Sequence, residues 1–261
     1  MERKANKLKK ILQEGKIVFG SCICSFSPNL VELAGYCGLD FCRIDNEHNW
    51  RQDSILEHMM RAGIVGDIVT LARIDKGNPY LIRKVLEIGA GGIIIPDIKD
   101  SDEVKSIVKA AKFSPYGNRG YSGLCLSGGY GTKAGKEWIE WSNKETLVGV
   151  MIEEPEAVKN INSIMSVEGL DFVLFGPADY SLSIGLSAPE KNNPKVQDAI
   201  KQTIEAANKY GKYVMIGVGY PWEEEAQKYI EMGCKMIEVG HDYSILNKIW
   251  KNILQKIKER R

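Results

Sequence analysis

Residues 41–73 read FCRIDNEHNWRQDSILEHMMRAGIVGDIVTLAR, two short apolar runs separated by an amphipathic stretch. The runs at 41–45 and 68–73 have the apolar character of buried strands, whereas residues 54–62 have the spacing of a helix with one apolar face. A strand, a helix and a second strand in this order predict a unit in which the two strands lie parallel.

The same alternation continues through the whole chain. Apolar, β-rich runs predict strands at residues 17–24, 41–45, 68–73, 92–96, 147–152, 172–175, 213–217 and 236–239. Helical patterns occur at residues 28–37, 54–62, 80–88, 102–111, 194–210, 222–232 and 244–258. Such repeats in 261 residues predict one (β/α)8 barrel domain spanning 1–261, since these barrels typically have about 250 residues. An open doubly wound sheet is the alternative, but no G-x-G-x-x-G motif follows the first predicted strand.

Composition narrows the possible functions. Lys and Arg total 35 against 34 Asp and Glu, a net charge of +1, which predicts neither a nucleic-acid nor a membrane partner. The amino-terminal segment lacks the continuous apolar run of a secretory leader, so we expect a cytoplasmic protein. The 6 cysteines form no C-x-x-C pair. We interpret them as small buried apolar residues in a reducing compartment, not as a zinc site or a disulfide framework.

Charged residues follow several predicted strands at their carboxyl ends, where the chemistry of such a barrel collects. They are Asp45-Asn46-Glu47-His48 after the second strand, Arg73 ending the third, Glu153-Glu154 after the fifth and Gly176-Pro177-Ala178-Asp179 after the sixth. Any one of them could be a solvated loop residue, but their coincidence at one end of several strands favours a functional site.

The residue types suggest separate roles. Glu153 and Asp179 are hard oxygen ligands suited to Mg²⁺ or Mn²⁺, and two carboxylates leave room for a bidentate 2-oxo acid. Bound in that way, the keto oxygen is polarised and an enolate can be stabilised. Arg73 could add positive charge at the developing oxyanion. His48 is the natural proton-transfer group, with Asp45 placed to orient it.

The other two histidines receive no role. His58 lies in a helical pattern. His241 follows the eighth strand, where the adjacent Asp242 is expected to cap a helix.

Several segments together resemble the HpcH/HpaI family of class II pyruvate aldolases, from Gly20 to the final helix. These are residues 38–41 (GLDF), 44–48 (IDNEH), 86–90 (LEIGA), 115–120 (PYGNRG), 152–153 (IE), 167–169 (VEG) and 176–181 (GPADYS). The family includes 4-hydroxy-2-oxo-heptanedioate aldolase and 2-dehydro-3-deoxyglucarate aldolase. The resemblance implies a TIM barrel of the pyruvate/phosphoenolpyruvate-utilising type.

The resemblance also implies a site. Glu153 and Asp179 match the ligands of Mg²⁺, Mn²⁺ or Co²⁺, and His48 matches the catalytic base, paired with Asp45. Arg73 matches the arginine facing the pyruvyl oxygens. Glu87 stands where the heptanedioate aldolase has an aspartate and is carried over as a catalytic residue. The backbone of Gly176, Pro177 and Ala178 matches the cradle for the substrate carboxylate.

The implied reaction is reversible aldol cleavage of a 4-hydroxy-2-oxo acid into pyruvate and an aldehyde, through a metal-stabilised enolate. The same enolate chemistry would serve an oxaloacetate-type decarboxylase or an acyl-CoA ester lyase, although no clear basic patch for CoA phosphates is present. A catalytically silent barrel that binds a 2-oxo acid is a further alternative. Met151 supports it, because close relatives have glutamine at this position, on the same strand face as Glu153. Cys22 lies near a position often filled by tryptophan.

Two segments predict self-assembly. The connection over residues 113–146 is long for a compact domain, which is typical of functional or partner-binding loops. The last predicted helix carries an apolar stripe too rich to stay exposed, formed by Ile245, Leu246, Ile249, Trp250, Ile253 and Leu254. We expect this helix to pack on its own barrel or to be swapped onto a neighbour's. The resemblance implies a homohexamer built as a trimer of dimers.

Strand geometry predicts one buried ion pair. If Asp45 points into the barrel mouth, Arg43 lies on the same face one layer deeper. Glu238 is in the middle of the eighth run, and the second and eighth strands can share an interior layer. An unpaired charge there would be very costly, so we predict that Arg43 and Glu238 pair. The alternative is that strand twist turns one of them outward.

Overall fold

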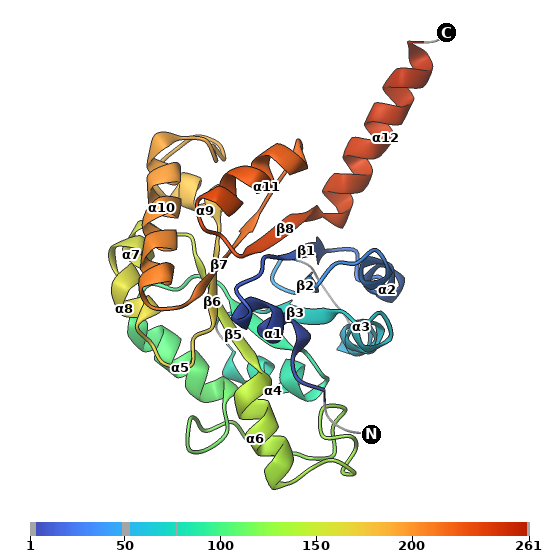
Figure 1. The fold of residues 1–261 in the computed structure, drawn as a ribbon, viewed down its shortest axis with the longest axis vertical. Helices are drawn as coiled ribbons and strands as arrows, with labels where there is room; N and C mark the ends of the chain where they lie inside the picture. The colour runs from blue at the N-terminus through green and yellow to red at the C-terminus, as the bar shows by residue number, and fades with distance from the viewer. Residues whose placement is uncertain (1–3, 49–52, 77, 260–261) are drawn as a thin grey trace.

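The computed structural model describes residues 4–48, 53–76 and 78–259. Its parallel strands close into a barrel in the order β1-β2-β3-β4-β5-β6-β7-β8 (Figure 1). They are β1 (Val18–Ile23), β2 (Phe41–Asp45), β3 (Val69–Arg73), β4 (Gly92–Ile95), β5 (Leu147–Ile152), β6 (Phe172–Phe175), β7 (Tyr213–Gly217) and β8 (Met236–His241). The predicted (β/α)8 barrel is confirmed, and the predicted strands differ from the observed ones only at their ends.

Most of the helices cover the outside of the barrel, whereas α1 lies at one end of it and α12 extends away from it (Figure 1). The helices are α1 (Lys7–Gln13), α2 (Pro28–Tyr36), α3 (Asp53–Val65), α4 (Pro79–Glu87), α5 (Ser101–Ala111), α6 (Lys136–Glu145), α7 (Pro155–Lys159), α8 (Ile161–Met165), α9 (Pro177–Ser183), α10 (Pro194–Lys209), α11 (Trp222–Glu231) and α12 (Asp242–Lys258). Five of these helices, α1, α6, α7, α8 and α9, were not predicted from the sequence. Four of them, α1, α7, α8 and α9, have at most 7 residues and so show few repeats of the apolar spacing. The connection over residues 113–146 therefore contains a helix, α6.

Apolar side chains fill the inside of the barrel in layers, as in other closed (β/α)8 barrels. Phe41, Leu71 and Phe172 belong to this interior cluster. Leu8 and Leu12 of α1 belong to it as well and are almost completely buried, so α1 closes the end of the barrel where the strands begin. With that end closed, only the carboxyl ends of the strands are left as an open mouth.

Arg43 and Glu238 form the predicted ion pair inside the barrel. Nε of Arg43 donates to Oε2 of Glu238 at 2.6 Å, and Nη2 donates to Oε1 at 2.8 Å. Both side chains are buried, so the alternative of an outward turn is wrong for both residues.

The last helix, α12, extends away from the barrel (Figure 1). Several of its apolar side chains are exposed, namely Leu246, Ile249, Trp250, Ile253 and Leu254. The expectation that this stripe packs on its own barrel is therefore wrong. In the part of the chain that the structure describes, no helix is long and apolar enough to cross a membrane.

Candidate active site

The charged residues identified in the sequence lie around the mouth of the barrel. Asp45 and Arg73 are register partners at the ends of β2 and β3. Glu153 directly follows β5, and Asp179 is in the first turn of α9, directly after β6. The carboxyl ends of parallel strands meet at one end of a closed barrel, so these four residues share one site.

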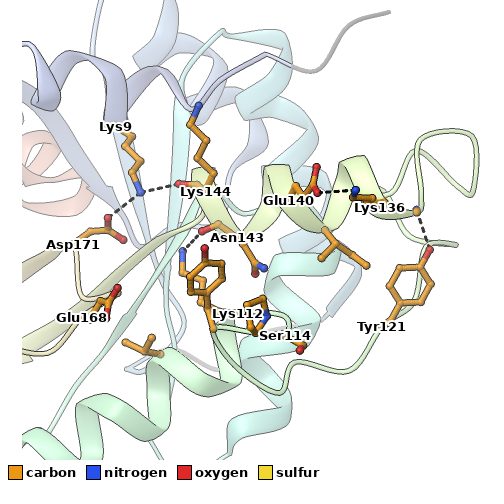
Figure 2. Close-up of a pocket in the computed structure, with 16 residues that line it drawn as sticks. Lys9, Lys112, Ser114, Tyr121, Lys136, Glu140, Asn143, Lys144, Glu168 and Asp171 are labelled. Atoms are coloured by element: carbon orange, nitrogen blue, oxygen red, sulfur yellow. Dashed lines mark hydrogen bonds and ion pairs between the residues drawn. The ribbon is translucent and has the colours of Figure 1, made fainter.

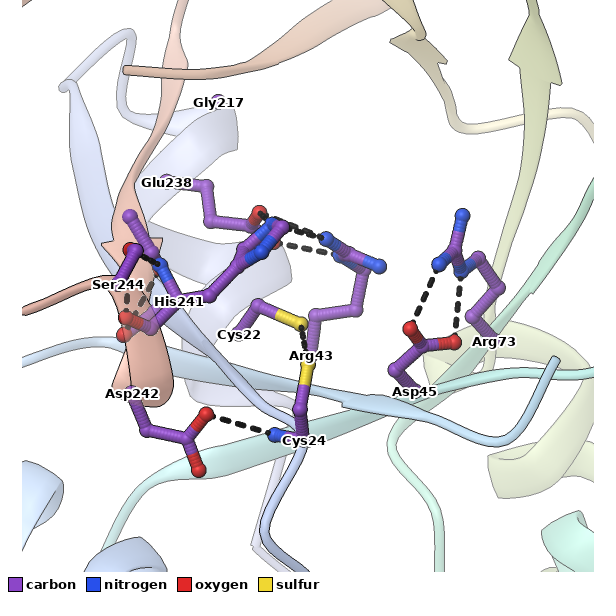
Figure 3. Close-up of polar contacts among 12 residues, drawn as sticks. Cys22, Cys24, Arg43, Asp45, Arg73, Gly217, Glu238, His241, Asp242 and Ser244 are labelled. Atoms are coloured by element: carbon purple, nitrogen blue, oxygen red, sulfur yellow. Dashed lines mark hydrogen bonds and ion pairs between the residues drawn. The ribbon is translucent and has the colours of Figure 1, made fainter. Parts of the chain in front are cut away.

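Asp45 and Arg73 form a buried ion pair with two hydrogen bonds (Figure 3). Nε of Arg73 donates to Oδ1 of Asp45 at 3.0 Å, and Nη2 donates to Oδ2 at 2.7 Å. Burial alone would raise the pKa of Asp45, but the hydrogen bonds and charge of Arg73 outweigh it and lower this pKa to about 2. The ionised carboxylate fixes the orientation of the guanidinium. Asp45 therefore orients Arg73 and not His48, which corrects the expected pairing.

Glu47 lies between Arg73 and His48. Its Oε2 is 2.9 Å from Nη1 of Arg73 and 3.8 Å from Nε2 of His48. Burial raises the pKa of Glu47, against the opposing effect of Arg73. The His48 side chain is 60% exposed, so the imidazole is open to solvent and substrate. The sequence analysis assigned Glu47 no role, although it lies in the same polar run after β2.

Met151 contributes a buried thioether to the wall of the site. Its Sδ lies 3.4 Å from Nη1 of Arg73 and accepts a hydrogen bond from it. The thioether is a weak acceptor, so it satisfies this nitrogen only partly.

Glu153 is a buried carboxylate among other carboxylates. Its Oε1 accepts a hydrogen bond from the backbone N–H of Asp97 at 2.7 Å. Burial raises the pKa of Glu153 to about 7, and the nearby charges of Asp179, Asp97 and Glu47 add to the rise. This crowding of negative charge is unfavourable without a cation. The donor set therefore fits a divalent cation held by Glu153 and Asp179.

The start of α9 lies against Glu153. A Cβ atom at Gly176 would come within 2.9 Å of Oε2 of Glu153 and 3.2 Å of Cε of Met151, so a larger residue here would push on both side chains. Pro177 is the first helical residue, and Ala178 and Asp179 are exposed. Backbone N–H groups in a first helical turn have no partner within the helix and can bind an anion.

Glu87 lies at the other end of the barrel. It ends α4 just before β4 begins, on the side where the strands start. Its backbone carbonyl accepts a hydrogen bond from the N–H of Ser127 at 3.0 Å, and its charge acts on the buried Arg119. A single chain therefore does not bring Glu87 to Asp45 and Glu153, which corrects its assignment to the same site. A catalytic role for Glu87 would require a neighbouring copy.

Two thiols that received no role, Cys22 and Cys24, lie near Asp45, and His241 lies beside the Arg43–Glu238 pair (Figure 3). The Sγ atoms of Cys22 and Cys24 are 3.5 Å apart. Nε2 of His241 is 3.4 Å from Nη2 of Arg43. Burial lowers the pKa of His241, against the opposing charge of Glu238. The sequence feature that could have identified the two thiols is their C-x-C spacing at the end of a strand, which places both side chains on one face.

Asp242 has a different role from the expected helix cap. Its carboxylate accepts hydrogen bonds from the backbone N–H groups of Cys24 at 3.1 Å and Ser25 at 2.9 Å. His241, not Asp242, occupies the N-cap position of α12. Asp242 therefore ties the start of α12 to the end of β1.

A cavity of about 1240 Å³ lies away from the mouth, near α1, α6 and the start of β6 (Figure 2). Two of its lysines, Lys9 and Lys112, are engaged with other protein groups. Lys9 pairs with Asp171 at 3.0 Å, and Nζ of Lys112 donates to the carbonyls of Asn143 and Thr146 at 2.8 Å and 2.7 Å. These contacts indicate a structural role for the charges, so the mouth of the barrel is the better candidate for chemistry.

Known proteins resemble the chain over nearly its whole length. The family model described as HpcH/HpaI aldolase/citrate lyase matches residues 20–248. The hydroxypyruvate/pyruvate aldolase of Delftia acidovorans is 29% identical over 246 residues, which are 94% of this chain and 90% of that protein.

Two solved structures are also similar to the chain over nearly its whole length. The HpcH/HpaI aldolase from Desulfitobacterium hafniense DCB-2 has a TM-score of 0.90 and 27% identity, with 98% of each chain covered. The citrate synthase SbnG has a TM-score of 0.87 and 30% identity, with 97% of this chain and 98% of that chain covered.

Proposed function

Because the chain belongs to the HpcH/HpaI aldolase/citrate lyase family and is an aldol-cleaving lyase, we propose that it reversibly cleaves a 4-hydroxy-2-oxo acid into pyruvate and an aldehyde. The observation that carries the proposal is the buried carboxylate of Glu153, near Asp179 and at the same mouth as the Asp45–Arg73 pair. The mouth thus offers two carboxylates, of Glu153 and Asp179, that suit a cation, and a guanidinium, of Arg73, that Asp45 holds in place.

Glu153 and Asp179 would hold Mg²⁺, Mn²⁺ or Co²⁺. Their oxygen donors suit these ions, and a cation would offset the negative charges of Asp179, Asp97 and Glu47 around Glu153. A bound divalent cation would polarise the keto oxygen of the substrate and lower the free energy of the enolate.

The other residues position the substrate and move protons. Arg73, held by Asp45, would face the pyruvyl oxygens, and the backbone of Gly176, Pro177 and Ala178 would bind the substrate carboxylate. His48 would take the proton of the 4-hydroxyl as the C3–C4 bond breaks and the aldehyde leaves. The electron pair of that bond remains on the three-carbon fragment, which gains a proton at C3 to give pyruvate.

The proposed reaction also sets the expected partners, location and assembly of the protein. The substrate is a free 2-oxo acid, and neither nucleic acid nor a membrane is needed for the reaction. The six cysteines, all within the described residues, form no disulfide, which suits the proposed cytoplasmic location. The exposed stripe of α12 supports a homo-oligomer, for which we propose a hexamer.

Citrate formation is a second candidate, supported by the 30% identity to the citrate synthase SbnG. It would use the same carbon–carbon chemistry in the direction of synthesis. An assay with oxaloacetate and acetyl-CoA, read out as citrate, separates it from the pyruvate reaction.

The test is to incubate the purified protein with Mn²⁺, pyruvate and a panel of aldehydes. Pyruvate consumption together with a new hydroxy-oxo acid supports the proposal, and the aldehyde giving the highest rate identifies the acceptor. No product with any aldehyde, while citrate forms in the parallel assay, contradicts it.

A further inference from the structure

The carboxyl end of β1 presents two thiols to the inside of the barrel. Cys22 and Cys24 are two residues apart, so their side chains lie on the same face, and both are buried. Their Sγ atoms are 3.5 Å apart (Figure 3). In a tetrahedral Zn²⁺ site with Zn–S bonds of about 2.3 Å, two sulfurs are about 3.8 Å apart. The two thiols are therefore already near the separation that a shared metal ion requires.

A carboxylate completes the group. Sγ of Cys22, Sγ of Cys24 and a carboxylate oxygen of Asp45 all lie within 4.8 Å of one another. Oδ1 of Asp45 accepts from Arg73 and from the N–H of Glu47, whereas Oδ2 accepts from Arg73. An ionised carboxylate has about four acceptor positions, so Oδ2 keeps one for a cation.

Charge balance permits a cation at this place despite two nearby guanidiniums. Arg43 is matched by Glu238 and Arg73 by Asp45, so the group is close to neutral while both thiols carry their protons. Binding of one divalent cation by two thiolates releases two protons and leaves the net charge unchanged.

We propose that Cys22, Cys24 and Asp45 form a second metal site, for a thiophilic divalent cation such as Zn²⁺. It differs in chemistry from the Glu153–Asp179 pair, whose oxygens suit Mg²⁺ or Mn²⁺. Asp45 is also the partner of Arg73, so a cation on Asp45 weakens the hold on that guanidinium. Resting on the proposed function, the consequence is that a thiophilic ion inhibits the lyase.

Binding is tested with Cd²⁺ as the probe, because Cd²⁺–thiolate bonds absorb in the ultraviolet and Cd²⁺–carboxylate bonds do not. The starting protein carries Cys37→Ser and Cys125→Ser, which removes the more accessible thiols, and Mg²⁺ is in excess. We expect the absorption to saturate with about two protons released per Cd²⁺. Adding Cys22→Ser and Cys24→Ser should abolish it, whereas adding Cys234→Ala, a buried thiol elsewhere, should not.

An absorption that is absent, or that survives loss of Cys22 and Cys24, overturns the site. If the variant lacking both thiols does not fold, Cys24→Ala alone decides the question in the same way.

Inhibition is tested separately at fixed Mg²⁺. Zn²⁺ should lower turnover of the starting protein, a chelator with low Mg²⁺ affinity should restore it, and the variant lacking Cys22 and Cys24 should resist. Undiminished turnover with Zn²⁺ bound overturns the link to Arg73. If the protein shows no lyase activity at all, the proposed function fails, and the Cd²⁺ absorption still decides the metal site.

Discussion

Arg43 in β2 and Glu238 in β8 reach each other past β1, the strand that lies between them in the barrel. Two hydrogen bonds join them, at 2.6 Å and 2.8 Å, and both residues are almost completely buried. Nη1 of Arg43 is buried without a hydrogen-bond partner among the described residues. Each buried charge in this pair is therefore stabilised mainly by the opposite charge of its partner.

Removing one partner should be far worse than removing both. Glu238→Ala should lower the free energy of unfolding by roughly 3–5 kcal/mol, because it leaves the Arg43 charge buried and unmatched. Arg43→Met combined with Glu238→Leu should cost much less, since apolar residues need no partner. Urea unfolding measures both, with Glu205→Ala at an exposed position of α10 as the control. A near-neutral Glu238→Ala would show that the pair is not needed for stability.

The Asp45–Arg73 pair should make stability depend on pH in acid. An unfolded aspartate has a pKa of about 3.9, and in the folded protein the pKa of Asp45 is about 2. Because the folded pKa is the lower one, the contribution is complete above about pH 4 and is lost as the pH falls towards 2. The shift corresponds to about 2–3 kcal/mol.

The comparison is between the protein and its Asp45→Asn variant, unfolded by urea at pH 7 and at progressively lower pH. The difference in unfolding free energy should shrink as the pH falls below 4. A difference that stays constant down to pH 2.5 would mean that the charge of Asp45 does not stabilise the fold.

Loss of the imidazole at position 48 should slow the reaction without affecting the metal. General acid–base catalysis typically contributes about 10²–10⁴-fold, so His48→Ala should reduce turnover by that order. His58→Ala, in α3, is the matched control and should run at the original rate. Metal affinity should be the same in all three proteins. A His48→Ala variant with full turnover would remove this histidine from the mechanism.

Removal of the metal should abolish activity reversibly. We expect EDTA to stop turnover and Mn²⁺ or Co²⁺ to restore it. Asp179→Ala should lose both metal binding and turnover while staying folded, whereas Asp198→Ala, exposed on α10, should lose neither. Full activity in EDTA, with a lysine–pyruvate adduct trapped by borohydride, would instead indicate Schiff-base chemistry.

The apolar stripe of α12 should be covered by another copy of the chain. Light scattering at micromolar concentration should show an oligomer larger than a dimer, and a hexamer is expected. Ile253→Glu places a charge in the stripe and should reduce the mass, whereas Lys251→Glu, also exposed on α12, should leave it unchanged. A monomeric protein would refute the assembly.

The sequence by itself determined the barrel and the end at which its chemistry lies. Buried strands need continuous apolar runs, and such runs are visible in a single chain. The period of two along a strand, with the cost of an unpaired buried charge, was enough to pair Arg43 with Glu238. Both arguments use only local geometry and a general energy penalty.

Only the tertiary structure decided which hydrogen-bond and ion-pair partners the polar residues have. The sequence predicted that Asp45 pairs with His48, but the register of β2 against β3 places it beside Arg73. The short helix α1, which closes the barrel, is too brief to be recognised from its spacing. Cys22 and Cys24 come close to Asp45 because β1 and β2 are neighbours in the closed barrel. Glu87 lies at the opposite end of the barrel from Asp45 because α4 runs back to the start of β4. Distances between side chains on different elements depend on barrel closure and strand register, which no local pattern encodes.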